Sequence, residues 1–240
     1  MSVQERYKQY VSDQREFFDT LITEDWETYK SEEWDEIRRF EIDQLFVRIQ
    51  PKTILDVGCG CGFHDQEMAI YPFVRSVDAI DYSSKSIEAA NKHYPHENVR
   101  RWAADITTLS CDRQYDLVVS YQVFEHVDTP DAFIIRSSQL LRPGGYLAIF
   151  TPNRNRLSNV LRRLKGQEPE LCDPQHFREY SPREIRSLAE SNGLEFVSWF
   201  GYGLSGMKFL DRQAASRRLR LGVSFPWIAN CFCLLLKKKS

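Results

Sequence analysis

The 240-residue chain lacks several features that would place it in a specialised class of protein. It has no excess of one charge, because 32 Lys and Arg side chains stand against 34 Asp and Glu side chains. This balance argues against a dedicated nucleic-acid binder. No apolar run reaches the about 18 residues that a membrane-spanning helix needs. The polar N-terminal residues show no leader pattern, so we expect a cytoplasmic protein.

The six cysteines do not have the spacing of a zinc or redox motif. One residue separates Cys59 from Cys61 and Cys231 from Cys233, whereas such motifs separate the two cysteines by two residues. No spacing of His, Asp and Glu indicates a tight metal site. We therefore expect reduced cysteines and a reaction that needs no metal.

The most informative stretch that is present is a glycine-rich turn. Residues 53–57 are apolar and rich in β-branched side chains, which predicts a buried parallel strand. Glycines follow at alternate positions, and residues 63–70 are predicted to form a helix. Such a corner lets a ligand approach the backbone closely, and the start of the helix offers it free N–H groups. The glycines are Gly58, Gly60 and Gly62.

Strands and helices continue to alternate after this corner. Further strands are predicted at 76–81, 99–104, 115–120, 146–150, 194–200 and 228–236. Helices are predicted at 85–92 and 131–141, and a third starts at the capping box Ser181-Pro182-Arg183-Glu184. Residues 1–50 are predicted to form helices. The pattern favours an α/β domain over residues 51–240, with a helical cap over residues 1–50.

An insertion interrupts the alternation at residues 154–180. In residues 154–165 apolar side chains recur at i, i+3, i+4 and i+7 among arginines, which predicts a basic amphipathic helix. Its apolar face has three possible partners. In the first alternative this face packs on the domain. In the second the helix belongs to a mobile lid over the site, and in the third it contacts an anionic membrane surface.

Several motifs resemble those of class I S-adenosylmethionine-dependent methyltransferases. The first is Asp56-Val57-Gly58-Cys59-Gly60-Cys61-Gly62. Later motifs, Phe124-Glu125-His126-Val127 and Asn153-Arg154-Asn155, are similar to those of small-molecule members, above all the O-methyltransferases of quinone biosynthesis. The resemblance covers residues 53–153. It implies a doubly wound, mostly parallel, Rossmann-like sheet of seven strands with an antiparallel last strand, and helices on both faces.

The resemblance implies S-adenosyl-L-methionine as cofactor and S-adenosyl-L-homocysteine as product. In the family, an acid at the end of the second strand accepts the ribose hydroxyls, and an acid after the third accepts from the adenine amino group. An arginine before the first strand, here Arg38 or Arg39, pairs with the methionine carboxylate. The other residues expected to bind the cofactor are Asp56, Gly58, Cys59, Gly60, Asp81, Tyr82, Asp105, Ile106 and Tyr121.

Methyl transfer to a hydroxyl group also needs a base. His126 follows the fourth strand, close to where the methyl group should lie, and His176 stands in the insertion, where family members contact their substrates. We expect these two histidines to be catalytic. Glu125 could orient His126. The expected substrate is a small, partly apolar molecule that is methylated at oxygen.

Two other functions remain open at this stage. A nicotinamide-dependent oxidoreductase would share the glycine corner and Asp81, but its fingerprint requires G-x-G-x-x-G or a final Ala, and this chain has Phe63 there. A pseudoenzyme would bind the cofactor and transfer nothing.

Overall fold

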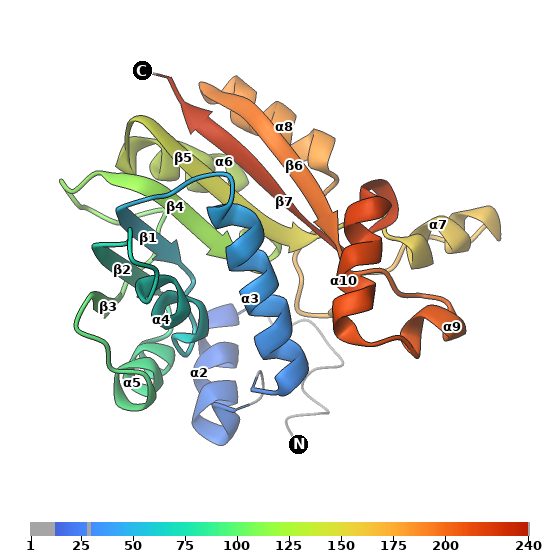
Figure 1. Ribbon diagram of the computed structural model, residues 1–240, viewed down its shortest axis with the longest axis horizontal. Helices are drawn as coiled ribbons and strands as arrows, with labels where there is room; N and C mark the ends of the chain where they lie inside the picture. Colours follow the sequence, from blue (N-terminus) through green and yellow to red (C-terminus); the bar gives the residue numbers. More distant parts are fainter. Residues whose placement is uncertain (1–12, 28–29, 240) are drawn as a thin grey trace.

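The computed structural model describes residues 13–27 and 30–239, and its centre is one seven-stranded sheet (Figure 1). The strand order is β3-β2-β1-β4-β5-β7-β6. Only β7 is antiparallel to its neighbours, β5 and β6. The doubly wound sheet predicted from the sequence is thereby confirmed. The strands are β1 Thr53–Val57, β2 Ser76–Asp81, β3 Val99–Ala103, β4 Tyr115–Tyr121, β5 Leu141–Pro152, β6 Leu194–Tyr202 and β7 Cys231–Lys238.

Helices cover both faces of the sheet and form two apolar cores with it. On one face, Ile42 of α3, Met68 of α4 and Leu219 of α10 pack on the strands. On the other face, Phe133 of α6 and Ile185 of α8 do so. The helices are α2 Gln14–Asp25, α3 Glu32–Phe46, α4 Phe63–Ala69, α5 Ser84–His93, α6 Pro130–Leu140, α7 Leu157–Leu164, α8 Pro182–Ser191, α9 Lys208–Asp211 and α10 Ala215–Ser224.

The sheet order creates a crevice between β1 and β4. From β1 the chain winds outward to β2 and β3, and it then returns to β4 on the other side of β1. Ligands of open α/β sheets bind at such a reversal, beyond the carboxyl ends of the strands. The fold therefore places the loops after β1 and β4 side by side at the expected binding edge.

Three local predictions were wrong. Residues 141–145, which lie at the end of the predicted helix 131–141 and before the predicted strand 146–150, belong to β5, because Leu141 pairs with Tyr115 before the register shifts. The last strand begins at Cys231, and a short 3-10 helix, η2 (Pro226–Ile228), takes the place of its expected start. Helix α3 ends at Phe46, before the end of the helical segment predicted over residues 1–50.

The N-terminal cap is described only in part. Residues 1–12 and 28–29 of the expected cap lie outside the described residues. Helices α2 and α3 fall within it, and α3 contributes to one of the two cores. In the described part of the chain, no helix combines the length and the apolar character that a membrane crossing requires.

Candidate active site

A cavity of about 1000 Å³ lies at the carboxyl ends of β1, β2 and β4. Helices α2, α3 and α10 line it together with residues of the insertion. It therefore gathers segments from the whole length of the chain at the crevice that the sheet order creates.

The glycine loop after β1 forms one wall, because its backbone lies close to the loop after β4. Gly58 has a φ of +77°, and a Cβ atom at this position would lie 2.3 Å from Cγ2 of Val123. The N–H groups of Gly58 and Cys59 donate to the carbonyl of Ile80 at 2.7 and 3.0 Å. Only glycine combines this backbone conformation with this close approach.

Asp81 stands at the end of β2 and faces the same cavity. Its Oδ2 accepts from the N–H of Gly60 at 2.9 Å, and its Oδ1 accepts from the N–H of Ser83 at 2.8 Å. Burial raises the pKa of this carboxyl to about 6, although the two backbone N–H groups act in the opposite direction. Each oxygen can accept a further hydrogen bond, as a ribose diol requires.

The cavity brings together nine of the ten residues that were predicted to bind the cofactor. Of the two arginine alternatives, only Arg38 lines it; the guanidinium packs 4.6 Å from the ring centre of Phe63 and pairs with Asp35. The nine residues are Arg38, Gly58, Cys59, Gly60, Asp81, Tyr82, Asp105, Ile106 and Tyr121.

Asp56 does not line the cavity and is buried at the end of β1. Neither carboxylate oxygen has a hydrogen-bond partner among the described residues. Burial raises its pKa well above the ordinary range, and the nearby charges of Asp65 and Asp81 add to the shift. Because Asp56 does not line the cavity, its carboxyl group is not placed to contact a ligand there directly, in contrast to the prediction from the sequence.

A second wall consists of polar side chains that sequence reasoning missed. Tyr202 donates to Glu41 at 2.5 Å and accepts from Gln122 at 3.0 Å. His64 contacts the same Glu41 at 2.9 Å and stacks on Tyr121 with ring centres 3.8 Å apart. The glutamate comes from α3 and the tyrosine from β6, 161 residues apart, so no local pattern could have indicated this network.

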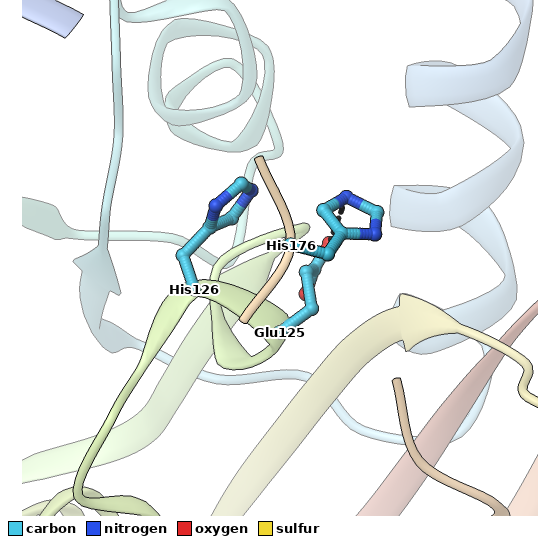
Figure 2. Close-up of side chains that lie close together, drawn as sticks. All are labelled: Glu125, His126 and His176. Carbon is cyan, nitrogen blue, oxygen red and sulfur yellow. Dashed lines mark ion pairs between the residues drawn. The ribbon is translucent and has the colours of Figure 1, made fainter. Parts of the chain in front are cut away.

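Both predicted catalytic histidines line the cavity and lie next to each other, with ring centres 5.0 Å apart. Figure 2 shows Glu125 and His126, from the 3-10 helix η1 (Phe124–His126), beside the ring of His176. Nδ1 of His126 lies 3.1 Å from the carbonyl oxygen of Gln175 and therefore donates to it. Burial and, to a smaller extent, the neighbouring His176 together lower the pKa of His126 to about 3, so its Nε2 is an unprotonated acceptor at neutral pH.

His176 lies between two carboxylates. Its Nδ1 is 3.2 Å from Oε1 of Glu179, and its Nε2 is 3.9 Å from Oε1 of Glu125. Burial alone would lower the pKa of His176, but the hydrogen bond to Glu179 and the charge of Glu125 raise it above the ordinary value. Glu125 is itself buried, which raises its pKa to about 7. Thr151 donates to its other oxygen at 2.9 Å.

The structure also assembles potential metal ligands that the sequence spacing did not indicate. Among the described residues, two groups bring their ligand atoms within 4.8 Å of one another. One group consists of Glu125, His126 and His176, and the other consists of Cys172, His176 and Glu179. The first group joins two segments about 50 residues apart, so it has no motif spacing. The predicted absence of a metal stays a prediction.

The strand order, the glycine loop and the acid at the end of β2 define a Rossmann-like domain that binds a nucleotide cofactor. Comparison with known families makes this class specific. Residues 27–198 match the model of the methyltransferase domain family, and the chain belongs to that family. Its fold is that of class I S-adenosylmethionine-dependent methyltransferases.

Named relatives agree with this membership. A "probable S-adenosylmethionine-dependent methyltransferase" of Mycolicibacterium smegmatis is 30% identical over 179 residues, which are 73% of this chain and 66% of the relative. The ubiquinone biosynthesis O-methyltransferase of Nitrosomonas europaea is 29% identical over 161 residues, 64% of this chain and 68% of the relative. The mitochondrial ubiquinone biosynthesis O-methyltransferase of Candida albicans is 34% identical over 134 residues, but this match spans only 54% of this chain and 40% of the relative.

Solved structures share the fold. The magnesium protoporphyrin IX methyltransferase of Synechocystis, with bound S-adenosylhomocysteine, superposes with a TM-score of 0.66 at 16% identity and covers 94% of this chain and 98% of its own. The N-methyltransferase NodS of Bradyrhizobium japonicum gives 0.63 at 15% identity, with the same coverage of both chains. At such identities the likeness concerns the fold alone.

The cavity residues fit S-adenosylmethionine, which is the cofactor of this family. Asp81 offers paired acceptors for a ribose, and at Gly60 the glycine loop leaves open space for a ligand beside the backbone. Family membership decides against the oxidoreductase alternative.

Proposed function

We propose that the protein transfers the methyl group of S-adenosylmethionine to an oxygen atom of a small, partly apolar molecule. One observation carries the proposal: the ring of His126, held through its Nδ1 by the carbonyl of Gln175, shares a single cavity with Asp81 and the glycine loop. The names of the ubiquinone biosynthesis relatives support oxygen as the acceptor atom. Four aromatic and aliphatic side chains support an apolar part of the substrate, namely Phe18, Trp34, Ile37 and Leu219, which line the same cavity.

The residues of this chain have separate tasks in such a transfer. The bound cofactor supplies an electrophilic methyl group on a sulfonium. Asp81 and the glycine loop hold the adenosyl part, and Arg38 pairs with the carboxylate. His126 would accept the hydrogen bond of the substrate hydroxyl and so orient its oxygen toward the methyl group. The hydroxyl proton would pass to Nε2 of His126 as the C–O bond forms and the C–S bond of the sulfonium breaks, which leaves a neutral thioether.

The low pKa of His126 leaves Nε2 unprotonated at neutral pH, so this nitrogen is available to accept the hydrogen bond of the hydroxyl. Because it is a weak base, it takes up the proton only as the bond to the methyl group forms and makes the hydroxyl more acidic. The ring is neutral throughout the physiological pH range, so no protonated fraction has to be removed before the substrate binds. After transfer, the imidazolium is a strong acid and loses its proton readily. His176 stays a second candidate for receiving it, since its carboxylate neighbours stabilise a positive charge.

The test is an incubation of the protein with S-adenosylmethionine that carries a labelled methyl group and with fractions of a cell extract. Mass spectrometry identifies any small molecule that gains one CH₂ unit. We expect an oxygen-methylated product with the native chain and at least a tenfold lower rate with His126→Gln, at unchanged affinity for S-adenosylhomocysteine. Tight binding of S-adenosylhomocysteine without any product from the extract would identify a pseudoenzyme.

We further propose that α7 contacts an anionic membrane surface. Leu164 at its end is 79% exposed, and the basic residues Arg162, Arg163 and Lys165 flank it in the sequence. The apolar side chains Leu157, Val160 and Leu161 are only half-buried, which supports incomplete packing of this face. Co-sedimentation with vesicles that contain anionic lipid should be lost at high salt and in Leu164→Asp. If the protein does not pellet with the vesicles at low salt, the membrane contact is excluded, and α7 either packs on the domain or belongs to a lid.

A further inference from the structure

We propose that the protein binds a zinc ion through Sγ of Cys172, Nδ1 of His176 and Oε1 of Glu179, at the wall of the cavity formed by the insertion. This inference concerns a site distinct from the cofactor residues, and it does not depend on the proposed methyl transfer. It is drawn from the distances between the three ligand atoms, from their chemistry, and from the side chains behind them.

The distances between the ligand atoms fit a tetrahedral ion. Sγ of Cys172 lies 3.7 Å from Nδ1 of His176, and this nitrogen lies 3.2 Å from Oε1 of Glu179. Zinc binds sulfur at about 2.3 Å and nitrogen or oxygen at about 2.0–2.2 Å, so tetrahedral angles separate neighbouring ligand atoms by about 3.3–3.6 Å. The third separation, between Sγ of Cys172 and Oε1 of Glu179, is within 4.8 Å, so the three atoms surround one position.

The donor set selects the class of metal. A thiolate, an imidazole and a carboxylate together suit zinc, whereas magnesium and calcium take oxygen ligands. Three protein ligands leave the fourth tetrahedral position open. Because Cys172 and His176 both line the cavity, this position is accessible from the cavity to water or to a polar group of the substrate.

A carboxylate stands behind the histidine ligand. When Nδ1 binds the ion, the ring hydrogen must be on Nε2, which faces Oε1 of Glu125 at 3.9 Å. This oxygen is fully buried and has no hydrogen-bond partner among the described residues, and Thr151 holds the other oxygen. A carboxylate that receives the second ring N–H is the usual support of a metal-bound histidine. Binding of the ion at Nδ1 would keep the ring hydrogen on Nε2, on the side of this oxygen.

The carboxylate ligand has an orienting partner as well. The buried guanidinium of Arg156 pairs with Oε2 of Glu179, which leaves Oε1 directed at the histidine. The N–H of Cys172 donates to the same Oε1 at 2.6 Å, so the loop that carries the thiol is already closed onto the carboxylate. In the zinc-bound form, the ion replaces the hydrogen that Nδ1 shares with Glu179.

The site leaves the proposed role of His126 intact. With the zinc on Nδ1 of His176 and a hydrogen on its Nε2, that ring no longer offers a basic nitrogen. His126, whose Nδ1 is held by the carbonyl of Gln175, then remains the histidine of this pair that can accept a proton in the cavity. The alternative ion position, between Glu125, His126 and His176, would occupy that nitrogen.

The experiment measures zinc binding by the full chain after removal of metal with a chelator. Isothermal titration with zinc chloride, and metal analysis of the dialysed protein by mass spectrometry, should give one ion per chain. Cys172→Ser should lower the zinc affinity at least tenfold. Glu125→Gln, which removes the support behind His176, should lower it by about 10–100-fold. Cys111→Ser, a half-buried cysteine outside the site, is the matched control and should bind like the native chain.

Retained affinity for S-adenosylhomocysteine shows that each variant is folded. Failure of the native chain to bind zinc would overturn the inference while leaving methyl transfer untouched. Binding that survives Cys172→Ser but disappears in His126→Gln would also overturn it, because the ion would then occupy the alternative position.

Discussion

Oδ2 of Asp81 accepts a hydrogen bond from the N–H of Gly60 at 2.9 Å, so the acid that ends β2 holds the glycine loop that follows β1. Its Oδ1 also holds the N–H of Ser83, the residue that caps α5. One carboxylate thereby fixes both sides of the cofactor cavity. Substitution of Asp81 should therefore disturb the conformation of the glycine loop and weaken the binding of the cofactor at the same time.

Replacement of Asp81 by Ala should weaken the binding of S-adenosylhomocysteine by at least about 1–3 kcal/mol, because the ribose hydroxyls and two backbone N–H groups lose a charged acceptor. Isothermal titration measures the change. Asp112→Ala, which removes an exposed acid elsewhere, is the control and should bind normally. Equal affinity of Asp81→Ala and the native chain would exclude Asp81 from the site.

The same affinity should depend on pH. The pKa of Asp81 is raised by burial to about 6, and only the ionised carboxylate accepts from both hydroxyls. Below pH 6 the affinity for S-adenosylhomocysteine should therefore fall by up to about tenfold per pH unit, and above it the affinity should level off. Asp81→Asn should bind S-adenosylhomocysteine weakly, and its affinity should not change with pH around pH 6. An equally steep decline in Asp81→Asn would assign the titration to another group.

The free energy of unfolding should fall as the pH rises, whereas the affinity for S-adenosylhomocysteine should increase. Because folding raises the pKa of Asp81 from 3.8 to about 6, its contribution to stability is present below pH 4 and is lost as the pH rises through 6. Relative to Asp81→Asn, the native chain should lose about 3 kcal/mol of unfolding free energy between these limits. Urea unfolding of both proteins at several pH values measures the difference between their unfolding free energies. If this difference does not change with pH, the raised pKa of Asp81 is refuted.

Gly58→Ala should destabilise the fold and abolish tight cofactor binding. The φ of +77° costs a residue with a Cβ about 1–2 kcal/mol, and the contact with Val123 adds to it. Gly193→Ala is the matched control, since its φ is +82° but nothing lies within 4 Å of the added Cβ. Urea unfolding should show the smaller loss for Gly193→Ala. Introducing Val123→Ala into Gly58→Ala should restore part of the stability.

The buried ion pair between Asp65 and Arg101 should be the most sensitive polar contact of the fold. The carboxylate on α4 and the guanidinium on β3 form two hydrogen bonds of 2.7 Å, and neither side chain is more than 1% exposed. Asp65→Asn leaves a buried charge without its partner, so urea unfolding should show a loss of about 3–5 kcal/mol.

Two further variants control this prediction. Glu190→Gln, which breaks the exposed pair with Arg186, should cost no more than about 1 kcal/mol. The double variant Asp65→Leu with Arg101→Met removes both charges and should be more stable than Asp65→Asn. A loss in Asp65→Asn no larger than that in Glu190→Gln would show that the buried pair contributes little.

Local patterns predicted much of the fold, because they depend on neighbouring residues. Strands β1 and β2 have the predicted bounds, and the capping box of Ser181 and Glu184 is present at the start of α8. The pattern failed at residues 141–145, where Pro143 and two glycines resemble a turn. Pairing of Leu141 with Tyr115, a contact distant in sequence, draws these residues into β5.

The predicted cofactor residues reached the cavity for a simple reason. Most of them follow directly after a strand, and parallel strands bring their carboxyl ends to one edge of the sheet. Glu41 and Tyr202 were missed because they come from α3 and from the far end of β6. Nothing in the sequence around either residue indicates that their side chains meet.

The sequence by itself determined the strand, glycine turn and helix, since their conformations follow from the φ that glycine allows and from the periodicity of apolar residues. Only the tertiary structure decided that His176 stands between Glu125 and Glu179. That position depends on the insertion closing onto η1, where the N–H groups of Phe177 and Arg178 donate to the carbonyl of Glu125. Contacts between segments so distant in the chain arise from packing, which no local pattern encodes.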